Sequence, residues 1–136
     1  MDRIKETTKI QAIAETVWEN FIEIFPKLAA FDCPKIVLNG RFTAHAGMCY
    51  YTLNKIDISL KYYLVHKAHI IGDTLVHEIA HQVTYNLYGD NACTKLQGHG
   101  PEWCKVMTDY GLEPNRYHKM EIDRKMSLAE MIKKYA

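Results

Sequence analysis

The chain has 136 residues, of which 48% are apolar, and its 17 basic and 16 acidic residues leave a formal charge of +1. A chain of this length and hydrophobicity can bury a core of its own, so we expect a single domain over residues 1–136. The nearly balanced charge excludes the overall positive field that drives non-specific binding to phosphate backbones.

The cysteines and the hydrophobic runs bear on the cellular environment. Cys33, Cys49, Cys93 and Cys104 are far apart and form no C-x-x-C pair, which disfavours a redox dithiol made from sequence neighbours. The first residues show no signal peptide, and no segment approaches about eighteen consecutive apolar residues. We therefore expect no membrane partner and an intracellular, cytoplasmic protein with reduced thiols, with association with a nucleoid or nucleus left open. The sequence does not indicate an oligomeric state.

A long amphipathic helix is predicted near the N-terminus. Apolar residues recur at the helical period of about 3.6. They are Ile10, Ile13, Ala14, Val17, Phe21, Ile24, Phe25 and Leu28. We expect this helix to give way to a loop between Pro26 and Pro34, because a proline disfavours helix in the residue before it.

Strand-like segments follow, rich in β-branched and aromatic residues. They read KIVLNGRFTAHAGMCYY and KIDISL, with breaks at Asn39-Gly40 and Leu53-Asn54. Such a pattern predicts a small antiparallel sheet of about three strands. The predicted fold class is α+β, with helices packed around this sheet.

The remaining elements are predicted to be helices. Ser59 is a suitable N-cap for LKYYLVHKA, and Asp73 or Thr74 for the next helix. Pro101 is expected in the first turn of a further helix that Gly111 ends. Ser127 and Glu130 have the spacing of a capping box before a last helix.

The helix predicted after Asp73 carries the sequence HEIAH, residues 77–81. Histidines at i and i+4 project from adjacent turns on the same side, so His77 and His81 can bind one metal ion. Glu78 is turned about 100° around the helix and can reach a water molecule without being a ligand. This is the pattern of a Zn²⁺ site with two ligands and one general base.

A catalytic zinc normally has three protein ligands and an open position. His99 is the preferred third ligand, since it lies 18 residues after His81 between two glycines and just before a predicted helix. Glu102 is the main alternative and Asp90 a weaker one. Glu102 also fits an acidic residue in the first turn of a helix, where the helix dipole favours it.

The other histidines are less informative. His45, His66 and His69 are expected to be surface or partly packed residues. His118 follows the last ligand-bearing helix, and we regard it as a candidate transition-state stabiliser that would contact an oxyanion.

The ordered set of motifs resembles the SprT-like (Spartan-type) metalloproteases. The likeness starts with Ala46-Gly47-x-Cys49-x-Tyr51 and Ile56-Asp57-Ile58-Ser59. It continues through Asp73-Thr74-Leu75-x-His77-Glu78-x-x-His81, then Gly98-His99-Gly100-Pro101-Glu102-Trp103, and ends with Gly111-Leu112-x-Pro114-x-Arg116-x-His118.

This resemblance implies a zincin-like fold with zinc on His77, His81 and His99 and with Glu78 as the catalytic base. For the best-known members it also implies cleavage of proteins crosslinked to DNA, switched on by DNA. Many members carry a cysteine-rich zinc-binding segment after the protease core, whereas this chain has no cysteine after Cys104. We therefore expect a minimal protease core with at most weak DNA binding.

The sequence thus predicts a zinc metallopeptidase that hydrolyses peptide bonds of protein or peptide substrates, DNA-crosslinked proteins among the candidates. The alternative is a zinc-stabilised binding or regulatory module without significant turnover. Such a module needs the ligands but not Glu78, and it would close the fourth position, with Cys93 or Glu102 as candidate ligands.

Overall fold

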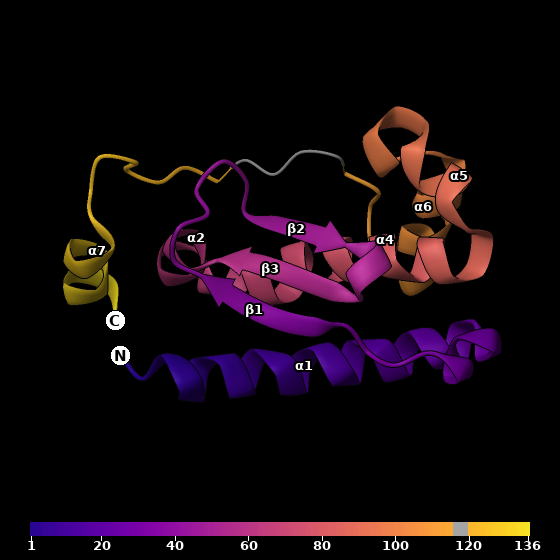
Figure 1. Cartoon of the computed structure of the whole chain (residues 1–136), viewed down its shortest axis with the longest axis horizontal. Helices are drawn as coiled ribbons and strands as arrows, with labels where there is room; N and C mark the ends of the chain where they lie inside the picture. The colour runs from indigo at the N-terminus through magenta and orange to yellow at the C-terminus, as the bar shows by residue number, and fades with distance from the viewer. Residues whose placement is uncertain (116–119) are drawn as a thin grey trace.

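The computed structural model describes residues 1–115 and 120–136. Long helix α1 (Arg3–Ile24) runs beneath a small sheet, and helix α4 (Leu75–Tyr88) lies behind the sheet (Figure 1). Helices α5 (Asp90–Thr94) and α6 (Pro101–Tyr110) lie at one end of the molecule, and α7 (Leu128–Tyr135) lies at the other (Figure 1). The predicted α+β class is confirmed.

Helix α1 has the face that the sequence predicts. Its N-cap is Asp2, whose side chain accepts a hydrogen bond from Lys5 N at 3.0 Å. The buried residues are Ile10, Ala14, Val17, Trp18 and Phe21, whereas Ile24 at the end of the helix is exposed. A 3₁₀ turn, Pro26–Ala30, follows the helix and occupies part of the region expected to be a loop.

The sheet consists of β1 (Lys35–Asn39), β2 (Gly47–Tyr50) and β3 (Lys55–Ser59) in the order β1-β3-β2. Strands β2 and β3 pair antiparallel, as predicted, but β1 and β3 pair in parallel, so the expectation of an antiparallel sheet is wrong for that pair. The hairpin with β2 uses one edge of β3 and leaves the other edge for β1. Residues 40–54 separate β1 from β3, which is long enough for the crossover that parallel pairing requires.

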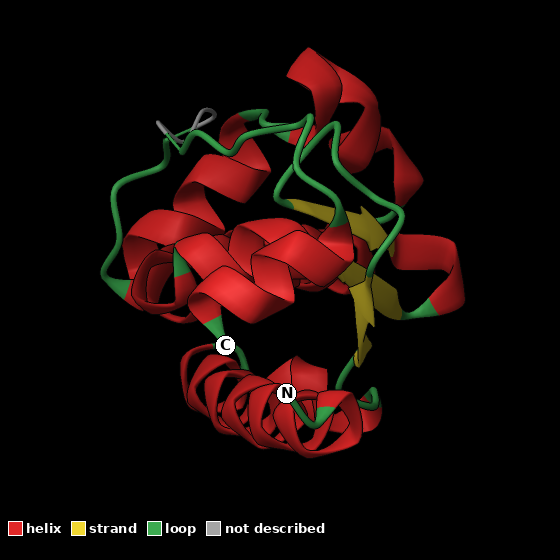
Figure 2. Ribbon diagram, turned by 90° about the vertical axis from the view of Figure 1, so that its left-hand side faces the viewer, coloured by secondary structure: helices red, strands yellow, loops and turns green. Residues whose placement is uncertain are grey.

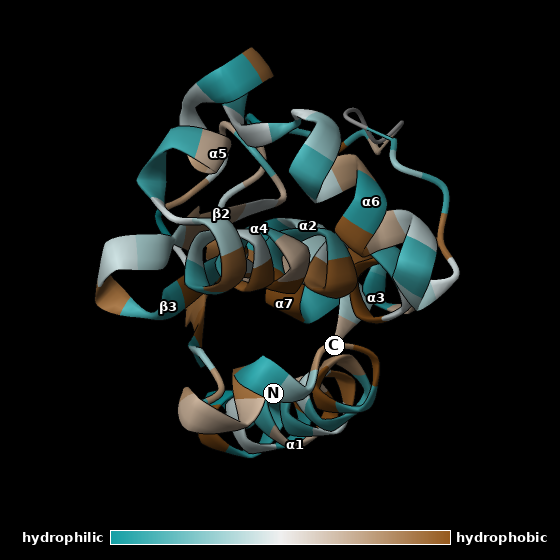
Figure 3. Ribbon diagram, turned by 90° about the vertical axis from the view of Figure 1, so that its right-hand side faces the viewer, coloured by the Kyte–Doolittle hydropathy of each residue, from teal (hydrophilic) through white to brown (hydrophobic). Residues whose placement is uncertain are grey.

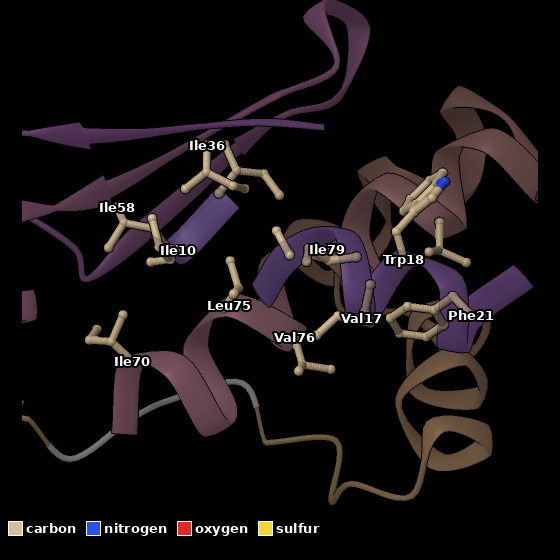
Figure 4. Packing of buried hydrophobic residues seen from close by; sticks show 14 of the residues in the cluster. Ile10, Val17, Trp18, Phe21, Ile36, Ile58, Ile70, Leu75, Val76 and Ile79 are labelled. Carbon is tan, nitrogen blue, oxygen red and sulfur yellow. The ribbon is translucent and has the colours of Figure 1, made fainter. Parts of the chain in front are cut away.

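The core lies between the helices and one face of the sheet. The parallel register places Ile36 beside Ile56 and Leu38 beside Ile58, so all four side chains project from the same face. Figure 4 shows Ile36 and Ile58 packed with residues of α1 and α4. In Figure 3 hydrophobic residues collect on the central helix α4, whereas the outer side of α1 is mainly hydrophilic.

The entry into α4 differs from the prediction. Ser59 does cap α2 (Leu60–Val65), accepting a hydrogen bond from Tyr62 N at 3.4 Å. A short helix α3 (Lys67–His69) and a π-turn (Ile70–Thr74) then run directly into α4. Thr74 keeps helical backbone angles and makes no capping hydrogen bond, so the predicted N-cap at Asp73 or Thr74 is wrong. The N–H of Leu75 bonds to the Ile70 carbonyl instead, and an N-cap is not needed.

The ends of the last two helices agree with the sequence. Pro101 occupies the first turn of α6, and Gly111 ends this helix with φ at +104°. Ser127 and Glu130 form the predicted capping box of α7. In Figure 2 the strands lie beside the central helices, and the helix that starts at the N-terminus lies below them. Within the described ranges, every helix is too short or too polar to traverse a lipid bilayer.

Candidate metal centre

Two histidines on α4 form the base of the site. His77 and His81 are one helical turn apart, and their ring centroids are 5.0 Å apart. His77 is 4% exposed and His81 is partly buried. Both side chains leave the helix on the side that faces β2 and the loop after α5, so two imidazoles converge as the i, i+4 spacing predicts.

His99 completes the group from a different element. It follows a tight turn, Lys95–Gly98, in which Leu96 and Gln97 have left-handed backbone angles. Its Nε2 lies 3.2 Å from Nε2 of His77, and its ring centroid is 4.8 Å from that of His81. One ligand atom from each of the three histidines lies within 4.8 Å of the others, so this group can hold a metal ion.

Gly98 permits the close approach of His99 to α4. Its φ of +83° favours glycine, and a Cβ at this position would lie 3.2 Å from Cε1 and 3.3 Å from Nδ1 of His81. The Gly98 backbone also hydrogen-bonds the His81 ring. Because Gly98 lies beside Nδ1, Nε2 is the nitrogen of His81 left for a metal, an arrangement that orients histidine ligands in many sites.

Burial keeps the His81 imidazole neutral. Desolvation and the neighbouring His99 lower the pKa of His81 to about 3, and the hydrogen bond with Gly98 opposes this shift only in part. A histidine must lose its proton before it binds a metal. Protons therefore compete little with a metal ion for the His81 imidazole at neutral pH.

Trp103 holds the three rings together from below. Its indole stacks on His81 at 5.3 Å with an interplanar angle of 17°, and it packs edge-on against His77 at 4.8 Å and His99 at 4.7 Å. The indole Nε1 donates a hydrogen bond to the His77 carbonyl at 3.3 Å, and Trp103 is completely buried. From the sequence, Trp103 was part of a motif but was assigned no role. Its position four residues after His99, at the start of α6, is the signal that points to it.

Glu78 is next to the histidine group and almost fully buried, with 7% exposure. Burial raises the pKa of its carboxyl to about 8. A cation held by the neighbouring histidines would lower this pKa again, because it favours the charged carboxylate. A general base works best when its pKa is near the working pH. The buried Glu78 carboxyl has this property.

The four residues line a cleft with a volume of about 450 Å³. Residues 44–49, which include most of β2, form one wall, and the loop residues 97–99 form another. Tyr62, Cys93 and Met120 also line the cleft. The outer edge of β2 borders this space and has no strand partner among the residues that the structure describes.

Comparisons with known proteins agree with these features. The sequence model of the SprT-like family matches residues 8–125. The chain belongs to the SprT-like family. Among its relatives, Protein SprT of Pseudomonas entomophila (strain L48) is 35% identical over 83 residues, which are 60% of this chain and 48% of that protein. Protein SprT of Vibrio parahaemolyticus serotype O3:K6 (strain RIMD 2210633) is 32% identical over 94 residues, 68% of this chain and 53% of that protein.

The SprT-like chain thus spans about half the length of the curated relatives that it matches. No solved structure matches it. All four residues of the candidate centre, His77, Glu78, His81 and His99, lie inside the matched range.

The alternative ligands of this SprT-like chain lie elsewhere. Glu102, in the first turn of α6, faces Lys95, with 3.8 Å between Oε1 and Nζ. Asp90 is exposed at the start of α5 and hydrogen-bonds Tyr51. Over residues 1–115 and 120–136, the metal-binding group comprises the three histidines and neither of these acids.

Two further histidines, His118 and His45, were also assigned from the sequence. His118, the candidate transition-state stabiliser, lies outside the described residues. His45, expected to be an ordinary surface or partly packed residue, is exposed and lies on the wall of the cleft, next to Ala46 and Gly47. An exposed imidazole therefore lies on this wall of the cleft.

Proposed function

We propose that this protein is a zinc-dependent metallopeptidase. The observation that carries the proposal is the convergence of His77, His81 and His99 beside a buried carboxyl, Glu78, in a cleft bordered by a free strand edge. A structural zinc site needs the histidines but has no use for the adjacent carboxyl or for the open cleft. The motif resemblance of this chain to SprT-like metalloproteases supports the same conclusion.

The three histidines fit zinc. Two nitrogens that each bind zinc at ~2.0–2.1 Å in tetrahedral geometry lie about 3.3 Å apart. The Nε2 atoms of His77 and His99 are 3.2 Å apart in this structure. Neutral imidazole nitrogens suit a borderline-soft ion such as zinc. A zinc ion held there would act as a Lewis acid that polarises a carbonyl group and acidifies water.

The residues of the chain supply the metal ligands and carry out the proton transfer. His77, His81 and His99 hold the ion, and Trp103 keeps their rings in position. Glu78 takes a proton from the water that attacks the scissile carbonyl and passes it to the departing amine. Its burial keeps bulk water away from this carboxyl, which strengthens its interaction with the reacting groups.

The edge of β2 suits an extended peptide as the substrate. Ser59 N donates to Ala46 O at 2.9 Å, and the antiparallel register continues from that pair through Gly47–Ile58. Because hydrogen-bonded and non-hydrogen-bonded pairs alternate, the backbone groups of Gly47 and Cys49 face away from β3, toward the free edge. A substrate strand can pair with these groups and lie across the cleft. Proteins crosslinked to DNA are one class of substrate that the family resemblance implies.

Glu78→Gln tests the proposed chemistry. The change removes the proton acceptor while keeping the size of the side chain, so cleavage of an unfolded protein substrate should fall about a hundred- to ten-thousand-fold. Zinc content and thermal stability should stay nearly the same, because Glu78 is not assigned as a ligand. Cleavage rates should be measured on zinc-loaded samples of matched concentration, with and without single-stranded DNA.

Two other outcomes speak against the enzyme. If wild type and Glu78→Gln both cleave nothing across a broad panel of substrates, the protein is better described as a zinc-stabilised binding module. Equal, non-zero cleavage by both samples would identify a contaminating protease as the source.

A further inference from the structure

Gly47 lies at the point where β2 comes closest to Glu78. A Cβ atom at position 47 would be 2.9 Å from Cγ and 3.3 Å from Oε2 of Glu78. It would also be 3.3 Å from Cδ1 of Ile58 on the neighbouring strand. A carbon–carbon approach of 2.9 Å is well inside the optimal separation of about 3.5–4.0 Å, so any side chain here forces a movement.

The backbone does not explain why glycine is found here. The glycines with positive φ are Gly89, Gly98 and Gly111, and Gly47 is not among them. Gly47 lies in an ordinary strand, where a residue with a side chain is normally more stable than glycine. The contact with Glu78 is therefore the feature that distinguishes this position.

Strand β2 is not free to retreat from α4. Gln82, next to His81 on α4, is 1% exposed, and its Nε2 donates to the Tyr51 carbonyl at 3.0 Å. Its Oε1 accepts from the Cys49 thiol at 3.7 Å. These two contacts hold the end of β2 and the turn after it against the helix.

When a side chain is added at position 47, the Glu78 side chain must therefore be the group that moves. Its Cγ is placed by χ1, and few χ1 values are allowed on a helix. A different χ1 moves Cγ away from β2 and carries the carboxylate away from its place beside the histidines.

We infer that Gly47 is a positioning residue: the missing side chain lets β2 pack against Glu78 and hold its carboxylate beside His77, His81 and His99. The kinetic part of this inference rests on the proposed function, in which Glu78 is the general base. The structural part does not. Gly47 also lies on the free strand edge, so the same residue sets the distance between a strand-paired substrate and the carboxylate.

The direct test is a structure of Gly47→Ala beside that of wild type. We expect the Glu78 side chain in another rotamer, with the three histidine rings unchanged. Gly72→Ala is the matched control, since Gly72 lies just before α4 and a Cβ there meets no atom within 4 Å. An unmoved Glu78 in Gly47→Ala, with β2 shifted instead, would overturn the inference.

Kinetics and zinc content supply the second readout. Because a small misplacement of a catalytic group costs about 10²-fold in rate, kcat of Gly47→Ala should fall by that order while KM and zinc content stay at wild-type values. Wild-type kcat in Gly47→Ala would overturn the inference while leaving the peptidase proposal intact. Failure of wild type to cleave any substrate would contradict the peptidase proposal. The comparison of the two structures would still decide the role of Gly47.

A variant that does not fold is also informative. Glu78→Ala removes Cγ, so Gly47→Ala should fold again in that background if the clash is with Glu78. If the double variant also fails to fold, the contact with Ile58 or the backbone is what requires glycine, and the inference is wrong.

Discussion

At the scale of single residues, the centre includes one imidazole, that of His81, that burial keeps neutral. Burial among neighbouring rings lowers the pKa of His81 to about 3, and Gly98 supplies a backbone hydrogen bond that orients its ring. Protons therefore compete little for His81 at neutral pH. The same surroundings place His99 3.2 Å from His77, so the ligand atoms need little rearrangement to meet an ion.

His99→Ala should sharply reduce zinc affinity, because only His77 and His81 then remain and a zinc site of this class uses three protein ligands. Glu102→Ala is the matched control from the same loop and helix, and it should keep about one zinc per chain. Zinc can be measured by elemental analysis after dialysis against a weak chelator. The assignment of the third ligand is wrong if His99→Ala keeps its zinc and Glu102→Ala loses it.

At the scale of elements, the site is formed by a helix, a loop and a strand edge. Helix α4 contributes two histidines and Glu78, the turn before α6 contributes His99, and β2 forms the opposite wall of the cleft. Trp103 from α6 lies beneath all three rings and joins the loop to the helix. A small movement of α6 relative to α4 would therefore separate the ligands.

The free edge of β2 leads to a prediction about substrates. Peptides methylated on single backbone nitrogens should lose affinity at every second position near the scissile bond, since only alternate residues of a paired strand point their N–H groups at the partner. Each lost hydrogen bond should raise KM about two- to tenfold. Steady-state kinetics on a series of singly methylated peptides measures this, with the unmethylated peptide as the reference. Equal effects at all positions, or none, would show that the substrate does not pair with β2.

At the scale of the whole molecule, charge is spread rather than concentrated. The formal charge is +1, and the described basic residues of the C-terminal part lie on or just before α7, at the end of the molecule opposite α5 and α6 (Figure 1). These residues are Arg124, Lys125, Lys133 and Lys134. Arg116 and Lys119, which the sequence adds to this group, lie outside the described residues.

We therefore propose that DNA binding by this chain is weak and strongly dependent on salt, since a few phosphate contacts are all that this distribution offers. Fluorescence anisotropy with single-stranded and duplex DNA at about 50 and 200 mM salt measures it. Replacing Lys133 and Lys134 by glutamine should weaken binding further and flatten the salt dependence. Tight binding that persists at about 200 mM salt would contradict this prediction and would favour a DNA-linked role.

The local features of this protein were determined by the sequence alone. The apolar period of residues 10–28, the i, i+4 spacing of His77 and His81, and the caps at Ser59 and Ser127 depend on neighbours a few residues away. Such features are visible in a linear sequence because one helical turn places those neighbours together. The approach of His99 to the pair was also expected, from its flanking glycines and the helix start that follows.

Only the tertiary structure decided the features that depend on distant segments. Alternating apolar residues look the same in parallel and antiparallel strands, so the direction of β1 against β3 could not be read from the pattern. The π-turn before α4 replaced an N-cap that the sequence favoured. The packing of Trp103 against His77 and His81 and the contact of Gly47 with Glu78 join residues more than 20 positions apart, and packing of that kind is set by the close fit of the folded core.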